Sequence, residues 1–204
     1  MLNLIVVGTP KYYTFFSEPS GNDSFPVSRL FESTPESLRS RLLPLTEKTY
    51  HFLQELPVVF MSEPEIEFDE DNEKIGYFSH IRLGKISKIS TSVYNREKVL
   101  AFDYEITSDI GYKPLTSDKE YVSELELGSF GLNRTFWAVK EISVNEILRV
   151  LGLEGYSNVE PATASAEAPE NNEELEIIAN INQYLQVILD HTQGNDEEVF
   201  YRGH

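Results

Sequence analysis

The chain has 204 residues, of which 40% are hydrophobic and 12% aromatic, and its formal net charge at pH 7 is −17. This composition excludes a mainly disordered chain, and the strong acidity argues against a general role in nucleic-acid binding. The chain has no cysteine, which excludes disulfides, thiolate metal sites and cysteine nucleophiles.

The negative charge is concentrated in two segments. Residues 63–73 contain seven acidic and no basic side chains, and residues 154–204 contain eleven acidic side chains and one base. Residues 74–98, in contrast, contain six basic side chains and one acidic side chain. We therefore expect a near-neutral domain with acidic appendages, and we interpret 63–73 as a solvated acidic loop.

The N-terminal part predicts a hairpin followed by helices. Leu2 to Val7 is almost continuously apolar, as in a strand covered on both faces, and residues 12–16 predict a second, aromatic strand. Residues 17–28 are rich in turn formers and predict a loop. A helical segment follows over 34–56, with Thr34 as its N-cap and a break at Pro44.

The centre of the predicted fold is a β unit over residues 56–106. In the long strand pattern from Ile75 to Thr91 the apolar phase slips at Gly84, where a β-bulge or barrel corner would need a glycine. Residues 99–106 alternate cleanly between two faces. These patterns predict an α+β fold with a bent antiparallel sheet or a small SH3-like barrel and flanking helices.

The C-terminal part predicts a strand over 133–142 and then a short helix. Ser143 and Glu146 form a capping box that opens this helix, and Gly152 ends it. We therefore assign residues 1–153 to one α+β domain.

Three segments follow the domain: a flexible acidic linker over 154–172, an amphipathic helix over 173–191 and an acidic tail over 192–204. The apolar face of the helix must dock on the domain, self-associate or bind another protein. Its candidate partner-binding residues are Ile178, Ile181, Leu185 and Ile188.

The sequence lacks the common catalytic patterns. None of its nine lysines stands two residues after an acidic residue, as the usual metal-dependent nuclease core requires. We assign no catalytic residue, no metal site and no cofactor. An enzyme alternative, a metal-dependent nuclease or other hydrolase, would be centred on His80 with Asp103 and Glu105.

Two groups of side chains are candidate contact sites. Arg82, Lys85 and Lys88 are possible nucleic-acid contacts, although we favour a solvent-exposed strand face as their explanation. A lone tryptophan, Trp137, stands in a strand that also carries Arg134 and Lys140; these three residues predict a protein-interaction site. The alternative is a core strand with the tryptophan inside.

The Arg-Thr-Phe-Trp-Ala-Val-Lys box at 134–140 resembles one found in a group of bacterial proteins. In that group the box follows a Leu-Pro-x-x-Phe strand, here Leu56–Phe60, and a Gly-x-Ile-x-x-Ile strand, here Gly84–Ile89. The similarity covers roughly residues 49–150, and the usual box has histidine where Phe136 stands. The resemblance implies a bacterial source and a mobile-element or defence setting, and it implies no activity.

We therefore expect a non-catalytic interaction protein, an accessory or regulatory subunit that binds a protein partner or self-associates through its C-terminal helix. The alternative from another class is an acidic nucleic-acid mimic that inhibits a DNA-binding protein. No apolar run is long enough to span a bilayer and the start lacks a basic signal-peptide region, so we expect a cytoplasmic location.

Overall fold

The computed structural model describes residues 1–68, 70–72, 74–114, 125–127 and 131–153, which all fall within the unit Met1–Pro169. The expected linker, C-terminal helix and acidic tail lie outside the described residues.

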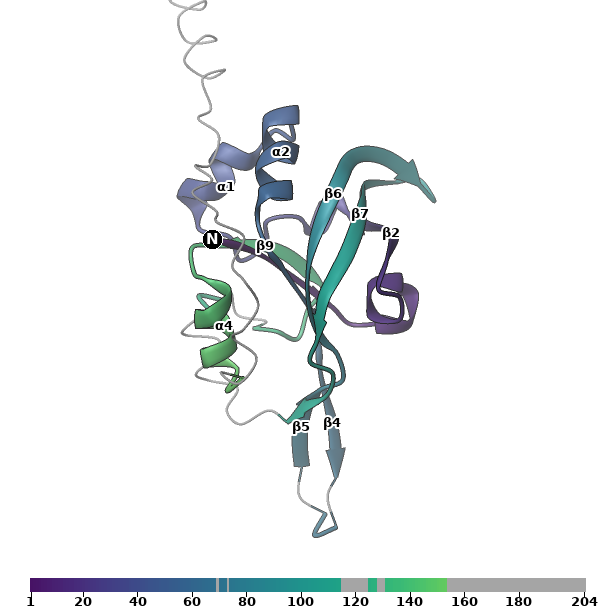
Figure 1. The fold of residues 1–204 in the computed structure, drawn as a ribbon, viewed down its shortest axis with the longest axis vertical. Coiled ribbons are helices and arrows are strands. Elements are labelled where there is room, and N and C mark those ends of the chain that lie inside the picture. The colour runs from purple at the N-terminus through teal and green to yellow at the C-terminus, as the bar shows by residue number, and fades with distance from the viewer. Residues whose placement is uncertain (69, 73, 115–124, 128–130, 154–204) are drawn as a thin grey trace, which may run out of the picture. The chain divides into compact units, whose positions relative to one another are not determined.

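The described elements are strands, short α-helices and 3-10 turns (Figure 1). The strands are β1 (Leu2–Val7), β2 (Ser20–Pro26), β3 (Val58–Ser62), β4 (Pro64–Phe68), β5 (Lys74–Phe78), β6 (Ile81–Tyr94), β7 (Glu97–Asp109), β8 (Lys113–Pro114) and β9 (Phe136–Lys140). The helices are α1 (Glu36–Leu42), α2 (Glu47–Glu55) and α4 (Val144–Val150), and the 3-10 turns are η1 (Pro10–Tyr12), η2 (Thr14–Phe16) and η3 (Val27–Arg29).

The main sheet has six strands in the order β2-β7-β6-β3-β1-β9. This arrangement confirms the α+β class. It does not form the expected SH3-like barrel, because β2 and β9 stand at opposite edges and the sheet does not close. Nor is the sheet purely antiparallel: β1 pairs with β3 in parallel, and the long connection that parallel pairing requires contains β2, α1 and α2.

The expected N-terminal hairpin was wrong. Residues 12–16 fall in η1 and η2 instead of a strand, and they place Phe15 fully inside the core. The expected loop over 17–28 contains β2, which pairs with β7 in antiparallel register. The polar side chains of β2 gave no strand pattern in the sequence, because an edge strand needs only backbone pairing and one half-buried face.

The central strands are covered on both faces, as predicted for residues 2–7. Ile5 and Val7 belong to one core cluster, with Trp137 and the buried residues of α1 and α2. Leu4 and Val6 point to the opposite cluster, which contains the buried residues of α4. Every residue of β1 is therefore buried, and its polar residue Asn3 is hydrogen-bonded.

The predicted irregularity at Gly84 is confirmed. The β6–β7 register shifts between Leu83 and Gly84, and a Cβ on Gly84 would lie 2.4 Å from the backbone oxygen of Glu105. A second shift, between Ser87 and Ser90, was not predicted; it includes Lys88 at φ 49°. The two bulges bend β6, so that its two ends contribute to different core clusters.

The capping box at Ser143 is also confirmed, and the predicted stop at Gly152 has φ 65°. The expected N-cap Thr34 has another role. Its Oγ1 accepts a hydrogen bond of 2.9 Å from the Val139 amide of β9, and α1 begins at Glu36. The predicted helix break at Pro44 separates α1 from α2.

Candidate functional site

The main candidate is the hairpin formed by β4 and β5, which projects away from the six-stranded sheet (Figure 1). We call residues 64–78 the arm. Its base is anchored where the Ser62 amide donates to the His80 carbonyl (3.0 Å) and the His80 amide donates to Ser62 Oγ (3.3 Å). With β8 beyond β5, the arm forms a separate three-stranded sheet in the order β4-β5-β8.

One face of the arm is polar and internally bonded. The Tyr77 hydroxyl donates to Glu65 Oε2 (3.1 Å), the Tyr112 hydroxyl donates to Glu67 Oε1 (3.0 Å), and the two rings stack with centroids 4.9 Å apart. The hydrogen bond to Glu67 raises the pKa of Tyr112 above its ordinary value. Both glutamates are thereby held in place as exposed acceptors along β4.

The opposite face of the arm exposes two large apolar side chains. Ile66 is 66% exposed and Phe68 is 59% exposed, and both lie on the same face of β4 because they are two residues apart. The residue paired with Ile66 is Gly76, which has no side chain to cover it. The exposed residues Glu70 and Asp71 follow at the tip, so acidic groups flank the apolar pair.

The sequence contained a signal for this surface. Glu65, Ile66, Glu67 and Phe68 alternate between acid and apolar residue, which is the period of a strand. Their acidity led to the interpretation of 63–73 as a loop, and the loop is in fact confined to the tip. Asp69 and Glu73 lie outside the described residues.

The β6–β7 hairpin provides a second exposed apolar pair. Val93 is 74% exposed and Tyr94 is 64% exposed. They precede the two-residue turn Asn95–Arg96, where both residues have positive φ, as a type I′ hairpin turn requires. The surroundings of this pair differ from those of the arm, because its cross-strand partners are one base, Lys98, and one acid, Glu97.

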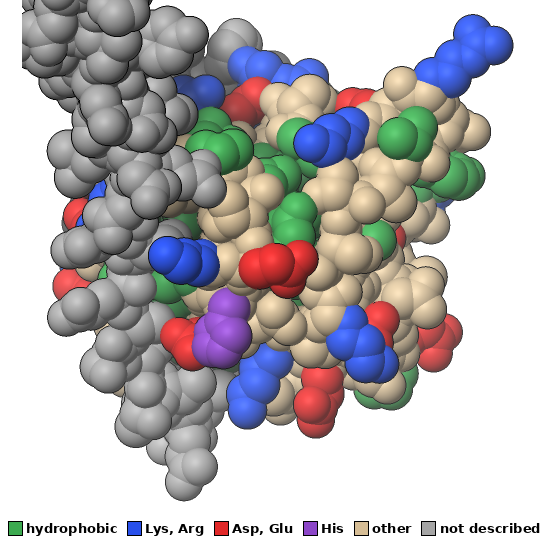
Figure 2. Space-filling model, turned by 90° about the horizontal axis from the view of Figure 1, so that it is seen from above, with side chains coloured by type: hydrophobic (Ala, Val, Ile, Leu, Met, Phe, Trp, Pro, Cys, Tyr) green, Lys and Arg blue, Asp and Glu red, His purple; other side chains and the backbone are tan. Residues whose placement is uncertain are grey.

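The three basic candidates do not form one basic surface. Arg82 is buried and donates to the backbone oxygens of Phe15 and Glu18, both at 2.9 Å. The Lys88 ammonium is paired with Asp103 at 2.6 Å. In the view of Figure 2, basic, acidic and apolar side chains are interspersed, without a continuous basic patch on that face.

Lys85, Asp103 and Glu105 line an open groove of about 670 Å³ that is formed by residues of β2, β6, β7 and α2. His80 is not among the lining residues. It lies against Phe16, with ring centroids 5.1 Å apart, and its Nδ1 contacts the Ser79 hydroxyl. The groove therefore does not bring together the histidine and the acids of the enzyme alternative. Among the residues that the structure describes, no group of three or more His, Asp or Glu side chains is arranged to hold a metal.

The candidate box at 134–140 is used mostly inside the protein. Trp137 is fully buried and its Nε1 donates to Asn3 Oδ1 at 3.0 Å. Lys140 is 2% exposed and its Nζ donates to the Glu126 backbone oxygen at 3.0 Å. Neither side chain is exposed for contact with a partner. The burial of Trp137 agrees with the alternative stated above, a core strand with the tryptophan inside.

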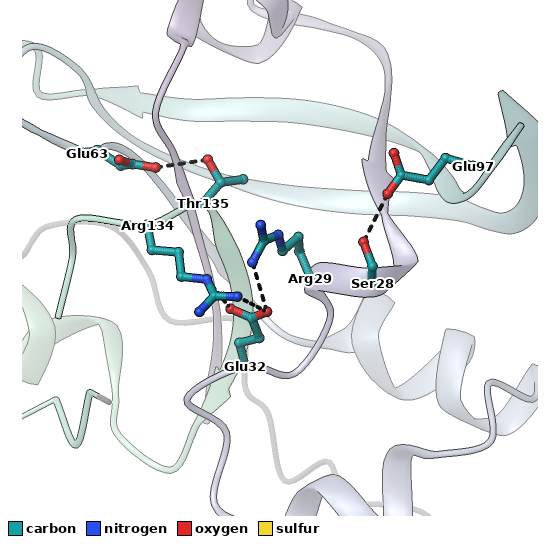
Figure 3. A network of polar contacts seen from close by, with 7 residues as sticks. All are labelled: Ser28, Arg29, Glu32, Glu63, Glu97, Arg134 and Thr135. Atoms are coloured by element: carbon teal, nitrogen blue, oxygen red, sulfur yellow. Dashed lines mark hydrogen bonds and ion pairs between the residues drawn. The ribbon is translucent and has the colours of Figure 1, made fainter. Parts of the chain in front are cut away.

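Arg134 remains partly exposed at the end of this strand. It forms an ion pair with Glu32, with Nε 3.0 Å from the nearer carboxylate oxygen, and Arg29 reaches the same carboxylate at 3.3 Å. Figure 3 shows the two guanidinium groups converging on Glu32, and the neighbouring Thr135 donating to Glu63. This network joins the start of β9 to η3 and to the entry of the arm.

A pH-dependent stability follows from Lys140. Burial lowers the pKa of Lys140 from 10.5 to about 8, so between these values the unfolded chain binds more protons than the folded one. The free energy of unfolding should therefore rise with pH in this window, by about 1–2 kcal/mol from pH 7 to 9.5. Urea titrations of the wild type and Lys140→Met at both pH values measure it. The rise should be absent from the variant, and equal pH dependence in both proteins would contradict the assignment.

The remaining candidates, Ile178, Ile181, Leu185 and Ile188, lie outside the described residues. Comparison of the chain with protein-family models, with curated proteins and with solved structures finds no match. The resemblance carried by the 134–140 box thus depends on the quoted residues alone. In the described part of the chain, no helix has the length and apolar character needed to cross a membrane.

Proposed function

We propose that the protein is a non-catalytic interaction protein, an accessory or regulatory subunit, and that the arm is a principal contact element. The observation that carries this proposal is the exposure of Ile66 and Phe68 on a projecting strand flanked by acids. Burying the rest of these two side chains against a partner would contribute roughly 2–4 kcal/mol. Large apolar side chains at the centre of a polar rim are the usual composition of interface hot spots.

The acidic side chains of the arm favour a partner with a basic surface. The arm has exposed acidic side chains at Glu65, Glu67 and Glu70, and residues 63–73 contain no base. Such a surface attracts and orients a protein with a basic rim around an apolar patch. The bacterial mobile-element or defence setting implied by the box at 134–140, and a cytoplasmic location, belong to the same proposal.

The test is a tagged pull-down from native lysate treated with nuclease, read by quantitative mass spectrometry. The wild type is compared with Ile66→Ser/Phe68→Ser and with the matched control Val93→Ser/Tyr94→Ser, which removes an equally exposed apolar pair from the other hairpin. We expect the arm variant to capture at least ten-fold less of a stoichiometric partner than the wild type does. The control variant should capture as much of this partner as the wild type. Equal capture by both variants would refute the role of the arm.

A third variant, Ile181→Asp/Leu185→Asp, tests the contribution of the predicted C-terminal helix in the same experiment. Loss of the partner or of self-association in this variant alone would move the contact site from the arm to that helix. If the partner is a DNA-binding protein that DNA displaces from the wild type, the result favours the alternative of an acidic nucleic-acid mimic.

A further inference from the structure

The arm also has a free strand edge. β4 stands at the end of the three-stranded sheet, and β5 covers only one of its two edges. An uncovered edge presents a row of backbone N–H and C=O groups to which another extended chain can pair. Within the described residues, no backbone hydrogen bond outside the strand pairing reaches residues 64–68.

The edges of the six-stranded sheet are treated differently. At β9, the Phe31 amide donates to the Trp137 oxygen (2.6 Å) and the Val139 amide donates to Thr34 Oγ1 (2.9 Å). At β2, the Thr14 hydroxyl donates to the Asn22 oxygen (3.2 Å). Both edges therefore have partners from within the chain, whereas the described residues provide none for the edge of β4.

The side chains of β4 determine which strand fits this edge. A strand added beside β4 places side chains directly opposite Glu65 and Glu67 on one face and opposite Ile66 and Phe68 on the other. Basic residues suit the first face and apolar residues the second. A second copy of β4 would fit poorly: pairing centred on Ile66 sets Glu65 opposite Glu67, and a one-residue shift sets glutamate opposite an apolar residue.

We propose that the edge of β4 binds an extended segment of a partner protein in which lysine or arginine alternates with apolar residues. This inference deepens the proposed function and depends on it for the arm being a contact element. Backbone pairing provides part of the affinity, and the alternation of β4 provides the specificity.

The probe is an acetylated, fluorescein-labelled peptide, Lys-Val-Lys-Val-Lys-Val-Lys, titrated with the full chain by fluorescence anisotropy. Two analogues control for simple attraction to an acidic protein. One is the isomer Lys-Lys-Lys-Lys-Val-Val-Val, with the same charge and composition. The other is N-methylated at two adjacent central residues, which blocks both edges of the peptide strand and keeps every side chain. We expect the alternating peptide to bind at least ten-fold more tightly than either analogue.

Two protein variants of equal charge change locate the site. Glu65→Gln/Glu67→Gln should weaken binding of the alternating peptide at least five-fold more than Glu70→Gln/Asp71→Asn at the tip. Circular dichroism verifies that both variants are folded. Equal affinity for all three peptides, or no binding up to millimolar protein, would overturn strand addition.

The outcomes separate this inference from the proposed function. If the pull-down depends on Ile66 and Phe68 while the peptides bind alike, the arm is a contact element and strand addition is wrong. If the alternating peptide is preferred while the pull-down does not depend on Ile66 and Phe68, strand addition at β4 is supported and the proposed contact role of this exposed apolar pair is refuted.

Discussion

Replacing Trp137 by alanine is expected to lower the free energy of unfolding by about 3–5 kcal/mol. The indole is fully buried, with ring centroids 5.4 Å from Phe102 and 5.8 Å from Phe25, so its removal leaves a large cavity between β9 and β7. It also leaves Asn3 Oδ1 without its donor, while the Asn3 amide nitrogen still donates to the Leu53 oxygen.

Urea denaturation followed by far-ultraviolet circular dichroism measures this loss, because the variant has no tryptophan fluorescence. The matched control is Trp137→Phe, which keeps one aromatic ring in the site and removes the indole donor with the rest of the indole. It should cost about 1–3 kcal/mol, the usual penalty for an orphaned buried polar group. A loss in the free energy of unfolding below about 1 kcal/mol for the alanine variant would show that Trp137 is not a core residue. Trp137 would then again be a candidate residue for contact with a partner.

Replacing Arg82 by methionine is expected to lower the free energy of unfolding by about 2–4 kcal/mol. The guanidinium is buried and joins three segments: it donates to the Phe15 and Glu18 oxygens and pairs with Asp109 at 2.6 Å. Methionine fills much of the volume and satisfies none of these acceptors, and unpaired buried acceptors are costly.

The control for Arg82 is Asp109→Asn, which removes the charge of the half-exposed partner and keeps both carbonyl contacts. This variant should cost about 1 kcal/mol or less, because Asp109 is half-exposed and the asparagine oxygen can still accept a hydrogen bond from the guanidinium. Thermal unfolding by calorimetry distinguishes the two cases. Equal destabilisation by both variants would mean that the ion pair, and not the two backbone oxygens, accounts for the role of Arg82.

Sequence patterns found elements best where one periodic signal was undisturbed. The continuous apolar run of β1, the phase slip at Gly84 and the capping box at Ser143 each have one local physical cause, and each is confirmed. Polar edge strands were missed for the opposite reason. β2 contains few apolar residues, and the acids of β4 led to its interpretation as a loop; backbone pairing with a neighbouring strand forms both.

The candidate site shows the same division. The alternation of Glu65 to Phe68 was present in the sequence, but its meaning depends on the partner strand: only the pairing of Ile66 with Gly76 leaves the isoleucine uncovered. In the same way, the sequence could not decide between an exposed and a buried Trp137. That choice depends on Asn3, which is 134 residues away in sequence and accepts the indole hydrogen bond.

By itself, the sequence determined the α+β class, the apolar run of β1, the capping box at Ser143 and the uneven distribution of charge, because each depends on residues that are neighbours along the chain. Tertiary structure alone decided that β1 runs parallel to β3, that the sheet stays open, and that Arg82, Trp137 and Lys140 face inward. It also decided that the acidic stretch forms an arm with an exposed apolar face and a free edge. These outcomes depend on which distant segments pair with each strand edge and fill each core position. Local periodicity does not encode these long-range contacts.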